Sequence, residues 1–364
     1  MVQHESRLLP DTMMVSLHTA PNASGGVQLY QFLGHELISV SWTRESNEVS
    51  RCELTVPNTS DYTRLPDVTP WIHWVSVWDD TGRTLYWTGP IQRTVVTRKT
   101  LVISARDVMA LMSRTRCPIT KRWEVEWPVD IAEELVQHMI ELHGINTKAV
   151  IQPIHPLQYD ERYDFAVKND GTMLSQTFED LSRLGLRWTV ISGTPVLGPM
   201  TRTPIAALSE NDFVSEGLEV VRDGSATYND VLLRGADNLA QASVEMAGLH
   251  LQTTVTIDDM FGVSNVDRAT KQYVNYASRI RDTVTIPDNS MLHPSAPISL
   301  DMMIPSVRIT IDAYGMLLPM ELTGVDVSLS STASSVAIRM TSVADDIPEL
   351  LAIQQRESIS GGTA

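Results

Sequence analysis

The sequence predicts an α+β fold that is rich in β-strands. Three observations predict it: residues 1–115 hold short apolar runs at even spacing, the pattern turns helical from Pro128, and strand-like runs return after residue 206. The chain has 364 residues, of which 43% are hydrophobic. This length and composition suffice for more than one core and suggest two or three domains.

The N-terminal region predicts six strands, at residues 27–33, 36–43, 48–56, 71–78, 83–97 and 100–105. Pro, Gly, Asn and Asp separate these runs, a pattern typical of a small barrel or sandwich. Residues 79–82, Asp-Asp-Thr-Gly, are a hairpin turn signal. A short apolar helix is expected at 107–112 after the last strand.

The run at 71–78 is apolar on both of its faces, with only His73 and Ser76 as polar interruptions. A strand of this kind is covered on both faces. One face fits a barrel core, and the other requires a second domain or another subunit. We therefore interpret four tryptophans as packing or interface residues: Trp71, Trp74, Trp78 and Trp87.

Residues 116–205 predict a compact α+β unit. A helical stripe follows Asp130, and Gly144 stands where a C-cap glycine belongs. A second helix is expected at 171–185. A hairpin is then predicted at 186–197, with its turn at 192–195.

The C-terminal part is predicted to be mostly β. Strands are expected at 217–221, 228–235, 249–257, 307–312, 316–324, 325–330 and 335–341, with a helix at 267–281 and a loop-rich stretch at 287–305. Residues 342–364 end in small polar residues and predict a short helix with a frayed tail.

Composition excludes several classes of function. The net charge is -16 and the pI is near 4.9, so the chain does not present the clustered cations that grip nucleic acid. Cys52 and Cys117 are too few for a disulfide framework and are expected to be free, buried thiols. We expect no signal peptide and no membrane span, and hence synthesis in the cytoplasm.

No motif for catalysis, metal binding or cofactor binding is found, so no such site and no cofactor is predicted. His138 and His143 are not spaced as a helical zinc pair. Two alternatives stay open. Some pair among the 44 acidic residues suits glycoside cleavage, and the tryptophan-rich strand suits sugar stacking.

The order of several short segments resembles the tail hub proteins of tailed bacteriophages. This family comprises the minor tail or tail-associated proteins of long-tailed phages and the similar baseplate hubs of contractile tails. The resemblance lies in Trp-Thr-Gly-Pro-Ile at 87–91, Leu-Val-Ile-Ser-Ala-Arg-Asp at 101–107, residues 111–114, residues 181–190 and Asn-Asp-Val-Leu-Leu-Arg-Gly at 229–235.

The resemblance implies two related small β-barrels, the second split by an insertion. The first barrel is then 1–115 and the second is 206–240 plus 300–342. An α+β domain at 116–205 lies between them, a mixed insertion occupies 241–299, and a C-terminal helix and flexible tail occupy 343–364.

The implied function is structural and non-enzymatic. Three copies with two barrels each form a quasi-sixfold trimeric ring at the virion tail tip. The ring joins the sixfold distal tail ring or tail tube to tip or tape-measure proteins, and encloses a conduit through which DNA passes without specific binding. Since the chain ends shortly after the second implied barrel, we expect no added hydrolase or receptor-binding domain. A tail-borne cell-wall hydrolase and a carbohydrate-binding module are the alternatives.

Overall fold

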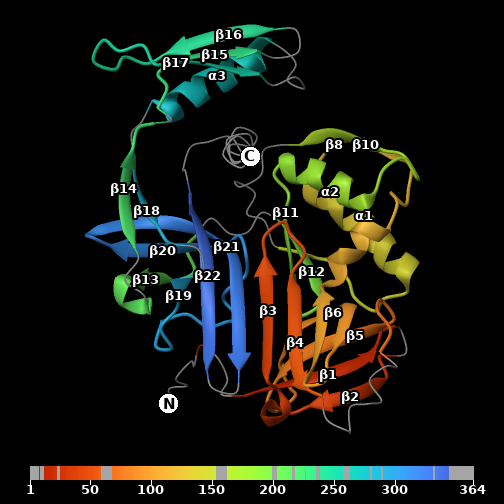
Figure 1. Cartoon of the computed structure of the whole chain (residues 1–364). Helices are drawn as coiled ribbons and strands as arrows, with labels where there is room; N and C mark the ends of the chain where they lie inside the picture. The colour runs from red at the N-terminus through yellow and green to blue at the C-terminus, as the bar shows by residue number, and fades with distance from the viewer. Residues whose placement is uncertain are drawn as a thin grey trace, which may run out of the picture. The chain divides into compact units, whose positions relative to one another are not determined.

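A computed structural model of the chain describes residues 8, 12–22, 25–58, 68–152, 162–198, 203–214, 218–225, 227–234, 238–256, 263–278, 281–287, 290–330 and 333–343 (Figure 1). The chain divides into two compact units. The first comprises Met1–Gly217 with Ile286–Thr341, and the second Leu218–Thr285 with Ser342–Ala364. As the sequence predicted, the chain is β-rich with few helices.

The largest sheet has twelve strands. Their bounds are β1 Met13–Thr19, β2 Gln28–Phe32, β3 Ser39–Glu45, β4 Arg51–Pro57, β5 His73–Asp79, β6 Leu85–Val96, β7 Thr100–Arg106, β13 Ala207–Ser209, β19 Ser290–Met291, β20 Arg308–Ala313, β21 Met316–Ser330 and β22 Ser334–Ser342. The main path runs β13-β20-β21-β3-β4-β7-β6-β5-β1-β2, and β22 pairs with β19 and β21. Among the described strands this path does not return to its start.

One antiparallel ladder joins the N-terminal and C-terminal strands of this sheet. Strand β3 pairs with the second half of β21, from Glu45 opposite Gly324 to Ser39 opposite Ser330. Figure 1 shows β21, β3 and β4 side by side although β21 is far from the other two in sequence. The pairing makes one sheet of two regions that the sequence suggested were separate.

Four of the predicted strands need correction. The strand expected at 36–43 begins at Ser39, because Gly34–Glu36 forms a 3-10 turn that the Glu36 carboxylate closes on the Leu33 N–H at 2.7 Å. The strand expected at 71–78 begins at His73, since Trp71 lies in a turn with φ 69°. The strands expected at 316–324 and 325–330 are one continuous strand, β21.

The α+β region follows β7. A 3-10 helix, Val108–Arg114, comes first; then come β8 Lys121–Glu126, α1 Pro128–His143, β9 Val150–Ile151, β10 Tyr163–Val167, α2 Leu174–Arg183, β11 Arg187–Ile191 and β12 Thr194–Gly198. The expected helices and the 186–197 hairpin are confirmed. Gly144 caps α1 in the left-handed conformation, φ 63°, as predicted, while the helix starts at Pro128 rather than after Asp130.

The second unit holds a three-stranded sheet and a helix. Its elements are β14 Glu219–Asp223, β15 Asp230–Arg234, β16 Leu239–Ser243, β17 Gln252–Thr256, α3 Val263–Ala277 and β18 Arg281–Thr285. The strand order is β16-β15-β17, with β14 pairing separately with β18. Val231 and Leu233 of β15 pack with Val266, Tyr273 and Val274 of α3 to form the core.

The helix predicted at 267–281 is α3, which begins earlier, at Val263, and ends earlier, at Ala277. The last residue that the structure describes is 343, so the helix predicted within 342–364 lies outside the described residues. The domain boundaries given above stay predictions. Among the described helices, none combines the length and the apolar character needed to cross a bilayer.

Candidate assembly site

The first part of the site is the junction between β6 and the end of β7. At Gly89 the two backbones approach so closely that an added Cβ would overlap the backbone oxygen of Arg106 and lie 2.8 Å from the Cα of Asp107. Only glycine allows this approach. The Trp-Thr-Gly-Pro-Ile segment and the Ala-Arg-Asp segment, singled out in the sequence, are thus two sides of one contact.

Asp107 fixes this junction from inside the protein. One carboxylate oxygen accepts the Met109 N–H at 2.9 Å and caps the 3-10 helix, while the other accepts the Ser50 N–H at 2.6 Å. The residue is completely buried. Burial raises the pKa of Asp107 to about 7, against the opposing effect of the hydrogen bonds from Ser50 and Met109.

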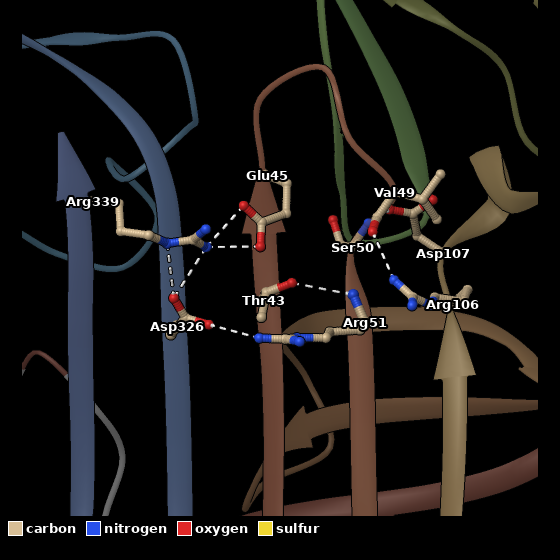
Figure 2. Close-up of polar contacts among 9 residues, drawn as sticks. All are labelled: Thr43, Glu45, Val49, Ser50, Arg51, Arg106, Asp107, Asp326 and Arg339. Carbon is tan, nitrogen blue, oxygen red and sulfur yellow. Dashed lines mark hydrogen bonds and ion pairs between the residues drawn. The ribbon is translucent and has the colours of Figure 1, made fainter. Parts of the chain in front are cut away.

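The second part is the β3–β21 ladder, which we call the seam and define by Glu45, Arg51, Gly324, Asp326 and Arg339. Figure 2 shows Arg339 between two carboxylates: Nη2 lies 2.7 Å from Glu45 Oε1 and 3.0 Å from Asp326 Oδ2. Arg51 Nη2 lies 4.0 Å from the other Asp326 oxygen. Four strands, β4, β3, β21 and β22, are therefore connected by charged groups.

Gly324 makes the seam possible. A Cβ there would overlap Nη2 of Arg339 and lie 2.9 Å from Oε2 of Glu45. Glu45 is only 8% exposed, and burial raises its pKa, although the hydrogen bond from Arg339 opposes the shift. A Thr-Gly pair precedes each close approach, at 88–89 and at 323–324. This repeated pair, which the sequence predictions above do not use, is a signal that could have indicated both positions.

A buried arginine extends the seam beyond the ladder. Arg44 Nη1 donates to the Leu300 carbonyl at 2.6 Å and to the Met303 carbonyl at 3.3 Å, and its guanidinium carbon lies 5.2 Å from the Trp42 ring centroid. Burial lowers its pKa to about 10, with Asp301 opposing the shift. Strand β3 thus also holds the chain segment that leads into β20.

The four predicted tryptophans do not form one patch. Trp74 is 2% exposed and belongs to the core cluster that includes α1, α2 and β11, and Trp71 packs against that cluster. Trp87 is 3% exposed and lies opposite Val77. Trp78 is half-buried, and its Nε1–H donates to Ser16 Oγ at 3.1 Å. One face of the Trp74 strand is thus covered by the α+β region of its own chain.

A serine–histidine contact crosses three strands near these tryptophans. His18 Nε2 lies 2.7 Å from Ser76 Oγ, which lies 2.7 Å from Thr88 Oγ1, and His18 Nδ1 lies 2.7 Å from the Thr19 carbonyl. Burial lowers the pKa of His18. Ser76 is 2% exposed, so its hydroxyl is out of reach of a substrate, and the contact pairs buried polar groups.

The other sequence candidates are also placed. Cys52 and Cys117 are free and buried, and burial raises the pKa of each thiol. His143 contacts Thr115 Oγ1 at 2.8 Å through Nε2. In the part of the chain that the structure describes, no group of three or more His, Cys, Asp or Glu is arranged to hold a metal ion.

Two three-stranded meanders in the first unit share several features. Both β5-β6-β7 and β20-β21-β22 have a long middle strand, and their second turns have the same hydrogen bonds. Thr97 N–H donates to the Thr100 carbonyl at 2.8 Å, and Ser330 N–H donates to the Ala333 carbonyl at 2.8 Å. Counted from these turns, Arg106 and Arg339 occupy the same position.

The strands beside the meanders also correspond. Strand β4 pairs antiparallel with β7, and β19 pairs antiparallel with β22. A 3-10 turn precedes β3 and β4 in the first case and β19 in the second. In each turn an acidic side chain accepts a backbone N–H at 2.7 Å: Glu36 from Leu33, and Asp212 from Ser209. The connection from β3 to β4 is a short turn. The corresponding connection, between Val214 and Ser290, contains most of the second unit.

Solved structures have this same architecture. The tail protein from Neisseria meningitidis MC58 matches with a TM-score of 0.59 and 15% identity, over 93% of this chain and 98% of that one. The 43 kDa tail protein of prophage MuSo2 from Shewanella oneidensis matches with a TM-score of 0.61 and 13% identity, over 92% and 100%.

The fold is that of the phage tail proteins. A third match to this tail-protein fold is the E. coli c3393 protein, a component of the type VI secretion system described as similar to the T4 tail proteins gp27 and gp5. Its TM-score is 0.50 at 10% identity, over 86% of this chain and 76% of that one. No protein-family model matches the sequence, and no curated protein matches it.

Proposed function

We propose that this chain is a structural, non-enzymatic tail hub of a bacteriophage. The observation that carries the proposal is the correspondence between the two meanders, together with a tail-protein fold that extends over nearly the whole chain. Each meander and its neighbouring strands form one of two related β-barrels, and the chain between Val214 and Ser290 splits the second.

Three copies supply six such barrels in a quasi-sixfold ring. That symmetry lets one face dock on a sixfold distal tail ring or tail tube, while the other presents threefold symmetry to the tip or tape-measure proteins. The seam supports this role, since a charged network between four strands holds the two barrels of one copy at a fixed spacing.

The hub encloses the conduit through which the genome leaves the particle, and it belongs to the virion tail tip. A net charge of -16 fits a wall that does not retain passing phosphates. The tryptophans support the assembly through packing in and around the first barrel rather than through a ligand.

Copy number in purified particles tests the proposal. Quantitative mass spectrometry against a tail-tube protein of known copy number should give three copies, and image reconstruction should place them at the tip. A copy number that is not a multiple of three contradicts the proposal. So does cleavage of peptidoglycan by the purified chain that one carboxylate substitution abolishes.

A further inference from the structure

We propose that the outer half of β6 is the acceptor edge for a strand from a second copy of this chain. The edge consists of Thr94 and Val96. This inference rests on the proposed function, which it deepens by naming the surface through which copies join.

The hydrogen bonds of β6 to the other described strands do not use this edge. The first half of β6 pairs with β5 as far as Pro90, and the second half pairs with β7 on the opposite edge. Thr97 donates toward β7, so the alternation of a strand directs the backbone groups of Thr94 and Val96 away from β7. No described residue pairs with that side. The described contact with this edge of β6 that lies nearest to it is the hydrogen bond from the Trp71 N–H to the Ile91 carbonyl.

The corresponding edge in the second meander is occupied. Counted from the matching turns, Thr94 corresponds to Val327 and Val96 to Leu329. Val327 lies opposite Trp42 and Leu329 opposite Val40, both on β3. Among the described residues there are therefore one filled and one unfilled example of the same edge.

Exposure shows the difference between the two examples. Leu329 is 8% exposed beneath β3, whereas Val96 is 62% exposed. Val96 lies opposite the buried Leu101 of β7, so its side chain is on the core face of the sheet yet uncovered. An open edge with an apolar side chain invites strand addition, which is how proteins often join through sheets.

The structure also indicates the segment that fills the edge. At the filled edge, the strand that pairs with β21 is β3, which also pairs antiparallel with β4. The segment that corresponds to β3 beside the second meander begins at Phe213. Phe213 forms an antiparallel bridge with Leu292, and the Val214 N–H donates to the Met291 carbonyl at 2.9 Å. Phe213 is buried like Val40, while Val214 is 55% exposed.

Residues around the acceptor edge and in the donating segment carry opposite charges. Arg93, Arg98 and Lys99 are exposed around the acceptor edge, although acidic residues outnumber basic ones in the chain as a whole. Glu210 and Asp212 precede Phe213 in the donating segment. The same strand addition, repeated from copy to copy, is head-to-tail and closes into a ring when the rotation permits.

Crosslinking tests the contact directly in the full chain. A photoreactive p-benzoylphenylalanine replaces Val96, and a mixture of light and heavy-isotope copies is irradiated. We expect crosslinks between light and heavy copies that map to the segment 203–214, which contains Phe213 and Val214. The matched control carries the same group at Leu317, which is 69% exposed on β21, and should not crosslink to that segment.

A charge substitution gives the second measurement. Val96→Asp should raise the dissociation constant of the trimer at least tenfold in analytical ultracentrifugation, while Leu317→Asp leaves it unchanged. Circular dichroism checks that both variants fold. If the wild-type chain is trimeric but Val96→Asp does not weaken it, or the crosslinks map elsewhere, this inference is wrong and the proposed hub stands. A particle copy number not divisible by three removes the hub itself.

Discussion

The carboxylate of Asp107 accepts the backbone N–H of Ser50 at 2.6 Å and thereby joins the start of β4 to the end of β7. The Asp107 N–H returns a bond of 3.1 Å to the Ser50 carbonyl. Because the other carboxylate oxygen caps the 3-10 helix, one side chain holds a strand start, a strand end and a helix start. These hydrogen bonds lie at the junction where the backbone of β6 approaches the end of β7 at Gly89.

The first prediction concerns pH. The pKa of Asp107 is raised by burial from 3.8 to about 7, so the folded state binds the proton more tightly than the unfolded state. Its stabilising contribution is complete below the unfolded pKa and is lost as pH rises through the folded pKa. Asp107→Asn should lower the free energy of unfolding by about 1–3 kcal/mol near pH 4, because its NH₂ cannot accept an N–H.

That deficit should shrink as the pH rises toward about 8, since only the wild type then pays for a buried charge. Urea unfolding at several pH values, comparing wild type with Asp107→Asn, measures the deficit. Asp80→Asn, at an exposed turn position, is the control and should be neutral throughout. A deficit that stays constant or grows with pH would show that Asp107 is ionised in the fold at low pH.

The second prediction concerns Gly89. Gly89→Ala should destabilise the chain by about 3 kcal/mol or more, because its methyl group meets backbone atoms of Arg106 and Asp107 that cannot move aside. Gly144→Ala is the comparison. It has open space but a φ of 63°, so it should cost only about 1 kcal/mol. Equal thermal midpoints for the two variants would contradict the close approach.

The third prediction concerns the seam. Arg339→Met leaves the carboxylate of Glu45 buried without its partner and should cost about 3 kcal/mol. Lys121→Met removes a more exposed pair, with Glu134, and should cost less than about 1 kcal/mol. Adding Glu45→Gln to Arg339→Met should recover part of the loss. Without that recovery in denaturant unfolding, the ion pair is not the source of the effect.

The fourth prediction concerns Trp74. Trp74→Ala should cost about 3–5 kcal/mol and appear as lower solubility, a lower thermal midpoint and impaired assembly. Ile72→Ala, at a side chain 58% exposed, should be close to neutral. A Trp74→Ala variant that folds and assembles normally but loses binding to cell-wall glycans would support the carbohydrate-binding alternative.

Several features followed from the sequence because local chemistry determines them. The Asp-Asp-Thr-Gly hairpin forms because the Asp79 side chain accepts the Arg83 and Thr84 N–H groups within the turn. Gly144 ends α1 because glycine tolerates the left-handed conformation. The apolar period likewise placed both helices of the α+β region and the strand pattern around them.

Contacts between distant segments needed the tertiary structure. The break expected after Gly324 is a continuous strand, because the glycine is there to admit Arg339 and Glu45 rather than to turn the chain. Pairing of β3 with β21, and the cover that α1 and α2 give Trp74, depend on which surfaces meet after folding. Sequence periodicity records that a face is buried, whereas the partner that buries it is decided by long-range packing.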